Sequence, residues 1–313
     1  MLHAVTCSRY TLRLRAVDAV RLPPFKGSAL RGGLGRALKR AACMVKGVEC
    51  LDCAFRATCP YAYLFETPPP PDAAMLRLYR SVPHPFVLEP PDDGITYYEP
   101  GRTFEAGAVL VGRAVDYLPW FVRAFVGFGR AGAGRGRGRF TVEAVCDGSD
   151  GKVVYDGVSE RFGATAGVLR PARGATLPIR PGGGLRLRLL TPLRIVHGGS
   201  LVSDLAFHHL VRTLLRRLSA LAWFHCAVRL ELDFRGLIER ASAVERAHAD
   251  LRWHDWERYS SRQKTRMRLG GLVGTVVFRG VDAGFAPILR LGEALHAGKG
   301  ATFGLGRYVL EGE

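Results

Sequence analysis

GRGRFTVE at residues 136–143 and GLGRYVLE at residues 304–311 share two glycines, an arginine and a final glutamate at the same spacing. A matching tetrapeptide precedes each stretch, RAVD at 113–116 and RGVD at 279–282. The LRLR motif of the opening segment also returns at the start of the second half. Because the matches keep the same order, we interpret the chain as an internal duplication.

Hydrophobic periodicity predicts the same elements in each half. In the first half we expect strands at 11–17, 108–115 and 140–145, a helix beginning at 28 and a helix at 117–128. In the second half we expect strands at 185–190, 272–278 and 308–310 and helices at 205–223 and 287–295. Strands and helices in this order are typical of the ferredoxin-like fold. The sequence therefore predicts an α+β protein with tandem ferredoxin-like (RRM-like) domains.

The chain has 313 residues, which is enough for two domains with a core in each. A hydrophobic content of 48% indicates a folded protein. We place the first domain at 1–162 and the second at 185–313, joined by a Gly/Pro-rich linker at 163–184. Within the first domain, residues of about 43–72 form a cysteine-containing insertion that ends in ETPPPPD.

The chain is strongly basic, with 45 lysines and arginines against 28 acidic residues and a formal net charge of +17. Such a field favours a polyanionic partner, above all nucleic acid. Arginine is much more frequent than lysine, and its planar guanidinium suits phosphates and bases. The N-terminus lacks a signal peptide pattern and the longest apolar run is too short to span a membrane, so we expect a cytoplasmic protein with no membrane partner.

Four of the seven cysteines lie close together with the spacing C-x6-C-x2-C-x5-C: Cys43, Cys50, Cys53 and Cys59. In a reducing compartment such a group suits a metal better than disulfides. Four thiolates hold either tetrahedral zinc or an iron–sulfur cluster. We predict a structural zinc site, with an iron–sulfur cluster as the alternative.

Several stretches spread over nearly the whole chain resemble one family. They are PPFKGSALRGGLGRAL at 23–38, PHPFVLEPP at 83–91, DWERYSSRQ at 255–263, GGLVG at 270–274 and GKGATFGLGRY at 298–308. With the tandem fold, they resemble the endoribonucleases that process CRISPR precursor RNA, within the RAMP (repeat-associated RNA-binding) superfamily. The resemblance implies that the protein binds a CRISPR repeat and cleaves the precursor into guide RNAs without a catalytic metal, leaving a 2′,3′-cyclic phosphate.

Three segments are candidates for contact with RNA. The segment at 252–268 interleaves basic and aromatic residues, which suits forks on phosphates and stacking on bases. The last glycine-rich stretch lets backbone amides approach a phosphate, and the central one carries several arginines. The residues concerned are Arg258, Arg262, Lys264 and Arg266 in the first segment, Gly298, Lys299, Gly300, Gly304 and Gly306 in the second, and Arg130 and Arg135 in the third.

Metal-free cleavage needs a base for the 2′-hydroxyl proton, an acid for the leaving 5′-oxygen and cations for the developing charge. The resembling family often uses a histidine near the first helix, but this sequence has none from 18 to 44. The candidates for these roles are Lys26, Arg31, His84, His254 and Tyr259. The missing histidine favours a second hypothesis, a non-catalytic subunit that scaffolds guide RNA among other subunits of a CRISPR effector complex.

Overall fold

The computed structural model describes residues 2–45, 47–69, 82–163, 167–180, 182–255, 257–260 and 265–312, with the backbone alone over 257–260 and 265–268. The chain forms two compact units. The first contains Thr6–Leu169 and Phe224–Ala227, and the second contains Met1–Val5, Arg170–Trp223 and Val228–Glu313. In the part of the chain that the structure describes, no helix is long and apolar enough to cross a membrane.

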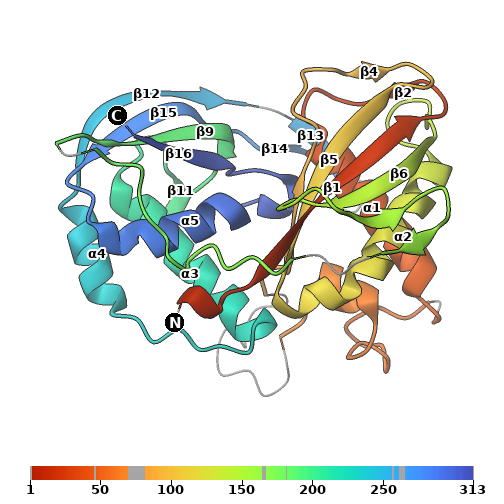
Figure 1. The fold of residues 1–313 in the computed structure, drawn as a ribbon, viewed down its shortest axis with the longest axis horizontal. Coiled ribbons are helices and arrows are strands. Elements are labelled where there is room, and N and C mark those ends of the chain that lie inside the picture. The colour runs from red at the N-terminus through yellow and green to blue at the C-terminus, as the bar shows by residue number, and fades with distance from the viewer. Residues whose placement is uncertain are drawn as a thin grey trace. The chain divides into compact units, whose positions relative to one another are not determined.

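The first unit is built on a six-stranded antiparallel sheet (Figure 1). Its strands, in spatial order, are β3 (Phe86–Glu89), β5 (Thr103–Val111), β1 (Cys7–Ala16), β6 (Phe140–Asp147), β7 (Val153–Asp156) and β8 (Arg161–Phe162). Two further short strands pair with each other, β2 (Val20–Arg21) and β4 (Tyr97–Tyr98). The order β3-β5-β1-β6 places the second, third, first and fourth strands side by side, which is the ferredoxin-like arrangement.

Helices α1 (Gly27–Ala42) and α2 (Leu118–Ala131) pack together against one face of this sheet. Alternate residues of β1, including Leu12 and Leu14, are buried on that face. The arginines between them lie on the opposite face, where Arg13 pairs with Glu105 on β5 at 3.4 Å. The alternating LRLR motif thus encodes a strand with one face in the core and one in solvent.

The second unit repeats this plan with a four-stranded sheet (Figure 1). Its strands, in spatial order, are β12 (Glu245–His254), β15 (Gly271–Arg279), β9 (Leu185–Leu193) and β16 (Tyr308–Gly312). Its helices are α3 (Phe207–His225), whose last two residues belong to the first unit, α4 (Phe234–Ser242) and α5 (Ala286–Leu295). Two small hairpins complete it, β10 (Val196–His197) with β11 (Ser200–Leu201), and β13 (Glu257–Ser260) with β14 (Thr265–Arg268).

The two sheets confirm the duplication that the sequence predicts. Both follow the same strand order, and the closing strand pairs with the opening strand in a matching register from Leu14 in the first unit and Leu187 in the second, although a β-bulge between Arg13 and Leu14 shifts the earlier part of the first pair. Leu14 lies opposite Val142 in the first unit, and Leu187 lies opposite Leu310 in the second. The structure adds β3 and β12, which the hydrophobic pattern did not reveal, so each half has the full four strands of the predicted fold.

A glycine fixes how closely the two helices of the first unit approach each other. A Cβ atom built on Gly33 of α1 would overlap the ring of Phe128 on α2. The neighbouring Gly32 lies on a more open side of the helix, where the nearest atom to such a Cβ is Nη1 of Arg36, at 3.5 Å. Of these two adjacent glycines, only Gly33 is therefore required by packing.

We predict opposite effects for alanine at these two positions. Gly33→Ala overpacks the helix contact and lowers the free energy of unfolding by roughly 1–3 kcal/mol. Gly32→Ala, the matched control, raises it by up to about 1 kcal/mol because alanine is the better helix former. Urea unfolding followed by circular dichroism measures both, and equal effects of the two variants would contradict the close approach at Gly33.

Candidate functional site

The structure brings two of the five candidate catalytic residues into contact. Nη2 of Arg31, in the second turn of α1, lies 3.1 Å from Nε2 of His84, which precedes β3. A guanidinium only donates hydrogen bonds, so Nε2 accepts here and the proton of the neutral imidazole lies on Nδ1. Nδ1 is 2.6 Å from Oγ1 of Thr67 and donates to it. Two partners thus hold the ring in one tautomer.

Two aromatic rings pack against the Arg31–His84 pair. His84 stacks on Phe86 of β3, with ring centroids 6.0 Å apart, and the guanidinium of Arg31 lies 5.2 Å from the ring centre of Phe65. Both polar side chains stay half-buried. An imidazole exchanges protons near neutral pH and a guanidinium offsets charge on a phosphate, so the pair has the chemistry of an acid–base site for phosphodiesters.

Lys26 has a different environment from Arg31, although both belong to the start of α1. Its side chain is only 1% exposed, and its Nζ lies 3.1 Å from Asp93 and 3.2 Å from the carbonyl oxygen of Pro91. Asp93 also accepts a hydrogen bond of 2.8 Å from Tyr98. Lys26 thereby ties the loop before β4 to the beginning of the helix, and its ammonium is enclosed.

The remaining catalytic candidates lie on the strands of the second unit. His254 ends β12 and is exposed, beside a Trp253 whose Nε1 donates to Asp255 at 2.9 Å. Tyr259, Arg258 and Arg266 fall on β13 and β14, where side chains lie outside the described residues, and Arg262 and Lys264 lie outside them altogether. The predicted roles of these residues stay predictions.

The glycines of the last glycine-rich stretch serve the backbone of the second unit. Gly298, Gly300, Gly304 and Gly306 all have positive φ. A Cβ on Gly306 would clash with the carbonyl oxygen of Ala297, and the amide of Gly306 donates to the carbonyl oxygen of Pro192 at 3.1 Å. The amide of Lys299 donates to the carbonyl of Arg194 at 2.8 Å, while its side chain is exposed. The loop is thus bound to the end of β9 and presents Lys299 outward.

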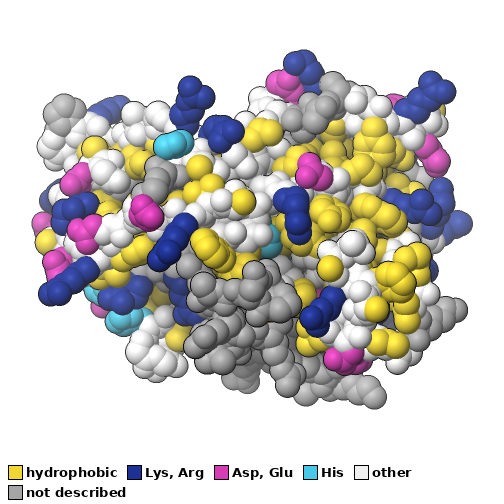
Figure 2. Space-filling model, turned by 90° about the horizontal axis from the view of Figure 1, so that it is seen from below, with side chains coloured by type: hydrophobic (Ala, Val, Ile, Leu, Met, Phe, Trp, Pro, Cys, Tyr) yellow, Lys and Arg dark blue, Asp and Glu magenta, His cyan; other side chains and the backbone are white. Residues whose placement is uncertain are grey.

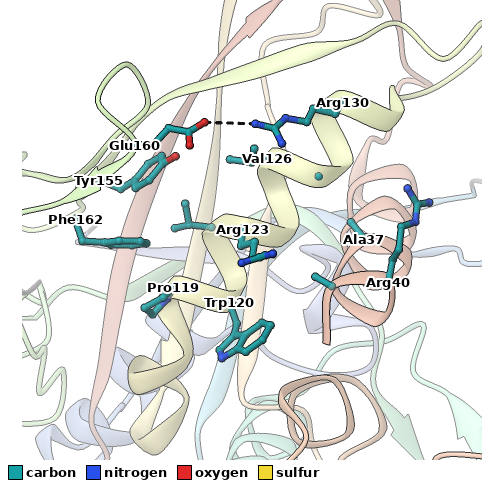
Figure 3. A pocket seen from close by; sticks show the side chains of 13 residues that line it. Ala37, Arg40, Pro119, Trp120, Arg123, Val126, Arg130, Tyr155, Glu160 and Phe162 are labelled. Atoms are coloured by element: carbon teal, nitrogen blue, oxygen red, sulfur yellow. Dashed lines mark hydrogen bonds and ion pairs between the residues drawn. The ribbon is translucent and has the colours of Figure 1, made fainter. Parts of the chain in front are cut away.

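Arg130 lines a groove of about 600 Å³ along α2, shown in Figure 3. α2 contributes Trp120, Arg123 and Arg130, α1 contributes Arg40, and the β7–β8 hairpin contributes Phe162 on the other side. Arg130 pairs with Glu160 at 3.4 Å. Among the described residues, Arg40 and Arg123 have no ion-pair or hydrogen-bond partner. The helical spacing of Trp120, Arg123 and Arg130 already indicates in the sequence that these three side chains share one face of α2.

Arg135 lies in the glycine-rich turn after α2. Its amide donates to the carbonyl of Arg21 at 3.0 Å, and it lines a second cavity of about 620 Å³ with Tyr97. The Arg21 guanidinium lies 5.2 Å from the Tyr97 ring centre. Figure 2 shows Lys and Arg side chains spread over one face of the molecule, with hydrophobic side chains exposed between them.

The four clustered cysteines line one cavity of about 370 Å³ at the end of α1. Burial raises the pKa of the Cys50 thiol, an effect that Lys39 opposes. Sγ of Cys43 lies 3.0 Å from the carbonyl of Val45, and the four sulfur atoms, all among the described residues, are not gathered closely enough to hold a metal ion. The donor set fits a soft cation in kind, but the sulfur atoms must move closer together to reach zinc–thiolate distances of about 2.3 Å.

Comparison with known families covers both halves. Residues 5–166 match the model of an N-terminal domain, AF_1859_N, and residues 187–308 match the model of the CRISPR-associated endoribonuclease Cas6. No curated protein sequence matches the chain.

Solved structures show the same fold at low sequence identity. Thermus thermophilus Cas6 is 14% identical, with 98% of each chain covered and a TM-score of 0.56. A Cas6 product complex is 16% identical, with 97% of this chain and 99% of the other covered and a TM-score of 0.58. Two Cas6-RT-Cas1–Cas2 complexes match at 16% identity, and this chain spans only 46% and 29% of those longer chains. The predicted tandem ferredoxin-like fold is confirmed.

The enclosure of Lys26 predicts an effect on stability. Asp93→Ala leaves the buried ammonium with the Pro91 carbonyl alone, and we expect it to lower the free energy of unfolding by about 1–3 kcal/mol. Lys26→Met removes charge and donor together, so it costs less. Burial raises the pKa of Asp93, but hydrogen bonds from Tyr98, from a backbone amide and from Lys26 outweigh this and leave it lowered.

The pair therefore stabilises the fold above the pKa of an unfolded aspartate, and this stabilisation is lost as the pH falls through the lower folded pKa. Urea unfolding at neutral and acidic pH measures the difference. An equal loss in Asp93→Ala at both ends of the range would contradict the ion pair.

Proposed function

We propose that this chain is a CRISPR-associated endoribonuclease of the Cas6 family, which binds a CRISPR repeat in RNA and cuts the precursor transcript into guide RNAs. The match of residues 187–308 to the endoribonuclease model carries this proposal. The net charge of +17 supports an RNA substrate.

We propose that the cut is an internal transesterification. The 2′-oxygen attacks the adjacent phosphorus, the bond from phosphorus to the 5′-oxygen breaks, and the products end in a 2′,3′-cyclic phosphate and a 5′-hydroxyl. One group removes the 2′-hydroxyl proton and another protonates the leaving oxygen. No step of this scheme requires a metal ion.

The Arg31–His84 pair is the part of the first unit that suits this chemistry. Nε2 of His84 holds a lone pair that now accepts from Arg31, and it becomes a proton acceptor for RNA once the guanidinium turns to a phosphate. Thr67 keeps Nδ1 protonated throughout. This histidine lies 53 positions after Arg31 in the sequence. We propose that it takes the role of the histidine that α1 lacks.

We propose that RNA phosphates lie along Lys299 in the second unit and along Arg123 and Arg130 in the groove of the first. Trp120 and Phe162 line the same groove and offer faces for stacked bases. Other CRISPR subunits are proposed partners, since part of the chains matched in a Cas6-RT-Cas1–Cas2 complex is similar to this one. The cysteine cavity is proposed to hold structural zinc, with an iron–sulfur cluster as the alternative.

A cleavage assay tests the proposed activity. We expect the purified protein to cut a labelled repeat RNA in EDTA and to leave a copy with a 2′-deoxy nucleotide at the cut site intact. His84→Ala should slow cleavage by about 10²-fold or more with little change in RNA affinity, and Thr67→Val should slow it less.

Binding of the repeat without any cutting would support the alternative, a scaffold for guide RNA in an effector complex. Cutting by His84→Ala at the original rate would remove His84 from the mechanism and leave the activity itself intact.

Elemental analysis tests the cysteine cavity. We expect about one zinc per chain in freshly purified protein, lost in the Cys50→Ser/Cys53→Ser double variant because two of four thiolates are gone. Cys226→Ser, outside the cavity, is the matched control and should keep the metal. Iron with sulfide would indicate the cluster instead, and a chain free of both metals would reject the site.

A further inference from the structure

Three histidine side chains meet at the start of α3 in the second unit. His197 lies on the β10–β11 hairpin, and His208 and His209 are the second and third residues of the helix. One ring nitrogen from each residue lies within 4.8 Å of the other two. The ring centroids of His208 and His209 are 4.2 Å apart, and those of His197 and His209 are 4.8 Å apart.

Neighbouring positions on a helix point in different directions, so two consecutive histidines do not normally converge on a third ring. Here the exposed hairpin brings His197 next to both of them. Asp204, the carboxylate that acts on His209, also forms an ion pair with Arg246. His197 is exposed and the other two are half-buried, so the three side chains are not enclosed in the core of the second unit.

The surroundings of the two helix histidines favour their neutral form. Burial lowers the pKa of His208, and the nearby His197 and Arg212 lower it further. Burial also lowers the pKa of His209, with His208 and His197 adding to the effect and Asp204 opposing it. The positive end of the helix dipole disfavours a charged imidazole in the first turn as well. A neutral imidazole carries the lone pair that a metal ligand needs.

We propose that His197, His208 and His209 form a binding site for a divalent transition-metal ion such as zinc, with water completing the coordination. Imidazole nitrogen is a preferred donor for zinc, nickel and copper. The three ring nitrogens must come closer together before each can form a zinc–nitrogen bond of about 2.0–2.1 Å. Rotation of the exposed His197 side chain allows this approach. Nδ1 of His209 accepts a hydrogen bond of 3.2 Å from the Ala206 amide, which leaves the proton of the neutral ring on Nε2. Binding a metal through Nε2 therefore moves that proton to Nδ1 and ends the hydrogen bond from Ala206.

The hairpin gives the metal a structural task. β10 and β11 pair over only two residue pairs, and both strands are exposed. Gly198 and Gly199 form the turn with φ values of 57° and 84°. So short a ribbon is marginal in water. A metal bound by His197 and the helix histidines fastens the hairpin to the first turn of α3.

Cobalt(II) titration tests the site and separates it from the cysteine cavity. In the Cys50→Ser/Cys53→Ser background, we expect one equivalent of cobalt to give visible d–d bands without the near-ultraviolet charge-transfer bands of thiolate ligands. His208→Ala should weaken the affinity by at least about 100-fold, more than the loss of an outer-shell partner causes. His248→Ala, which removes an exposed histidine of β12 outside the cluster, should bind like the parent.

A second variant guards against misfolding. His197→Ala changes only the exposed hairpin, and we expect the same loss of cobalt with an unchanged circular dichroism spectrum. Unchanged binding in both His197→Ala and His208→Ala, or an equal loss in His248→Ala, would overturn the proposal. Because the readout is metal binding, its failure is independent of whether the protein cuts RNA.

Discussion

The contact of Gly33 with the Phe128 ring sets the position of α1, and α1 carries most of what distinguishes the first unit. Its start holds the enclosed Lys26, its second turn holds Arg31, and its last turn leads into the cysteine cavity. A side chain at Gly33 would move all three features together, because a close-packed helix pair has no slack to absorb the added volume. One missing Cβ atom thus places an ion pair, a proton-exchange pair and a cluster of thiols.

The order of elements could be predicted from the sequence because the repeated motifs fall on the strands that open and close each sheet. β3 and β12 could not be predicted from the sequence, for different physical reasons. β3 has only four residues, all buried, so it shows no alternation. β12 is an edge strand that is exposed on both faces, so it carries no hydrophobic period to detect. Pairing with β15, and not its own composition, makes it a strand.

The candidate site also combines features that could be predicted from the sequence with features that could not. The cysteine spacing predicted a metal site formed by four thiols that are local in the chain, and all four line one cavity. The Arg31–His84 contact joins residues 53 positions apart, and only the sheet brings them together. The contact of His197 with His208 and His209 is also hidden in the sequence, because the sequence does not show that a hairpin returns His197 to them. Groups of residues that are close in the sequence could be predicted, whereas contacts between distant residues depend on the topology of the fold.

The shared register of the opening and closing strands bears on how the chain reaches its fold. Leu14 meets Val142 and Leu187 meets Leu310 through similar motifs, so either closing strand offers a usable edge to either opening strand. Repeated architectures of this kind are prone to misassembly between their halves. Synthesis from the N-terminus separates them in time: the first sheet can close on the order of ten seconds before the second closing strand leaves the ribosome. Direction of translation therefore protects a duplicated fold that refolding from denaturant would leave exposed to strand exchange.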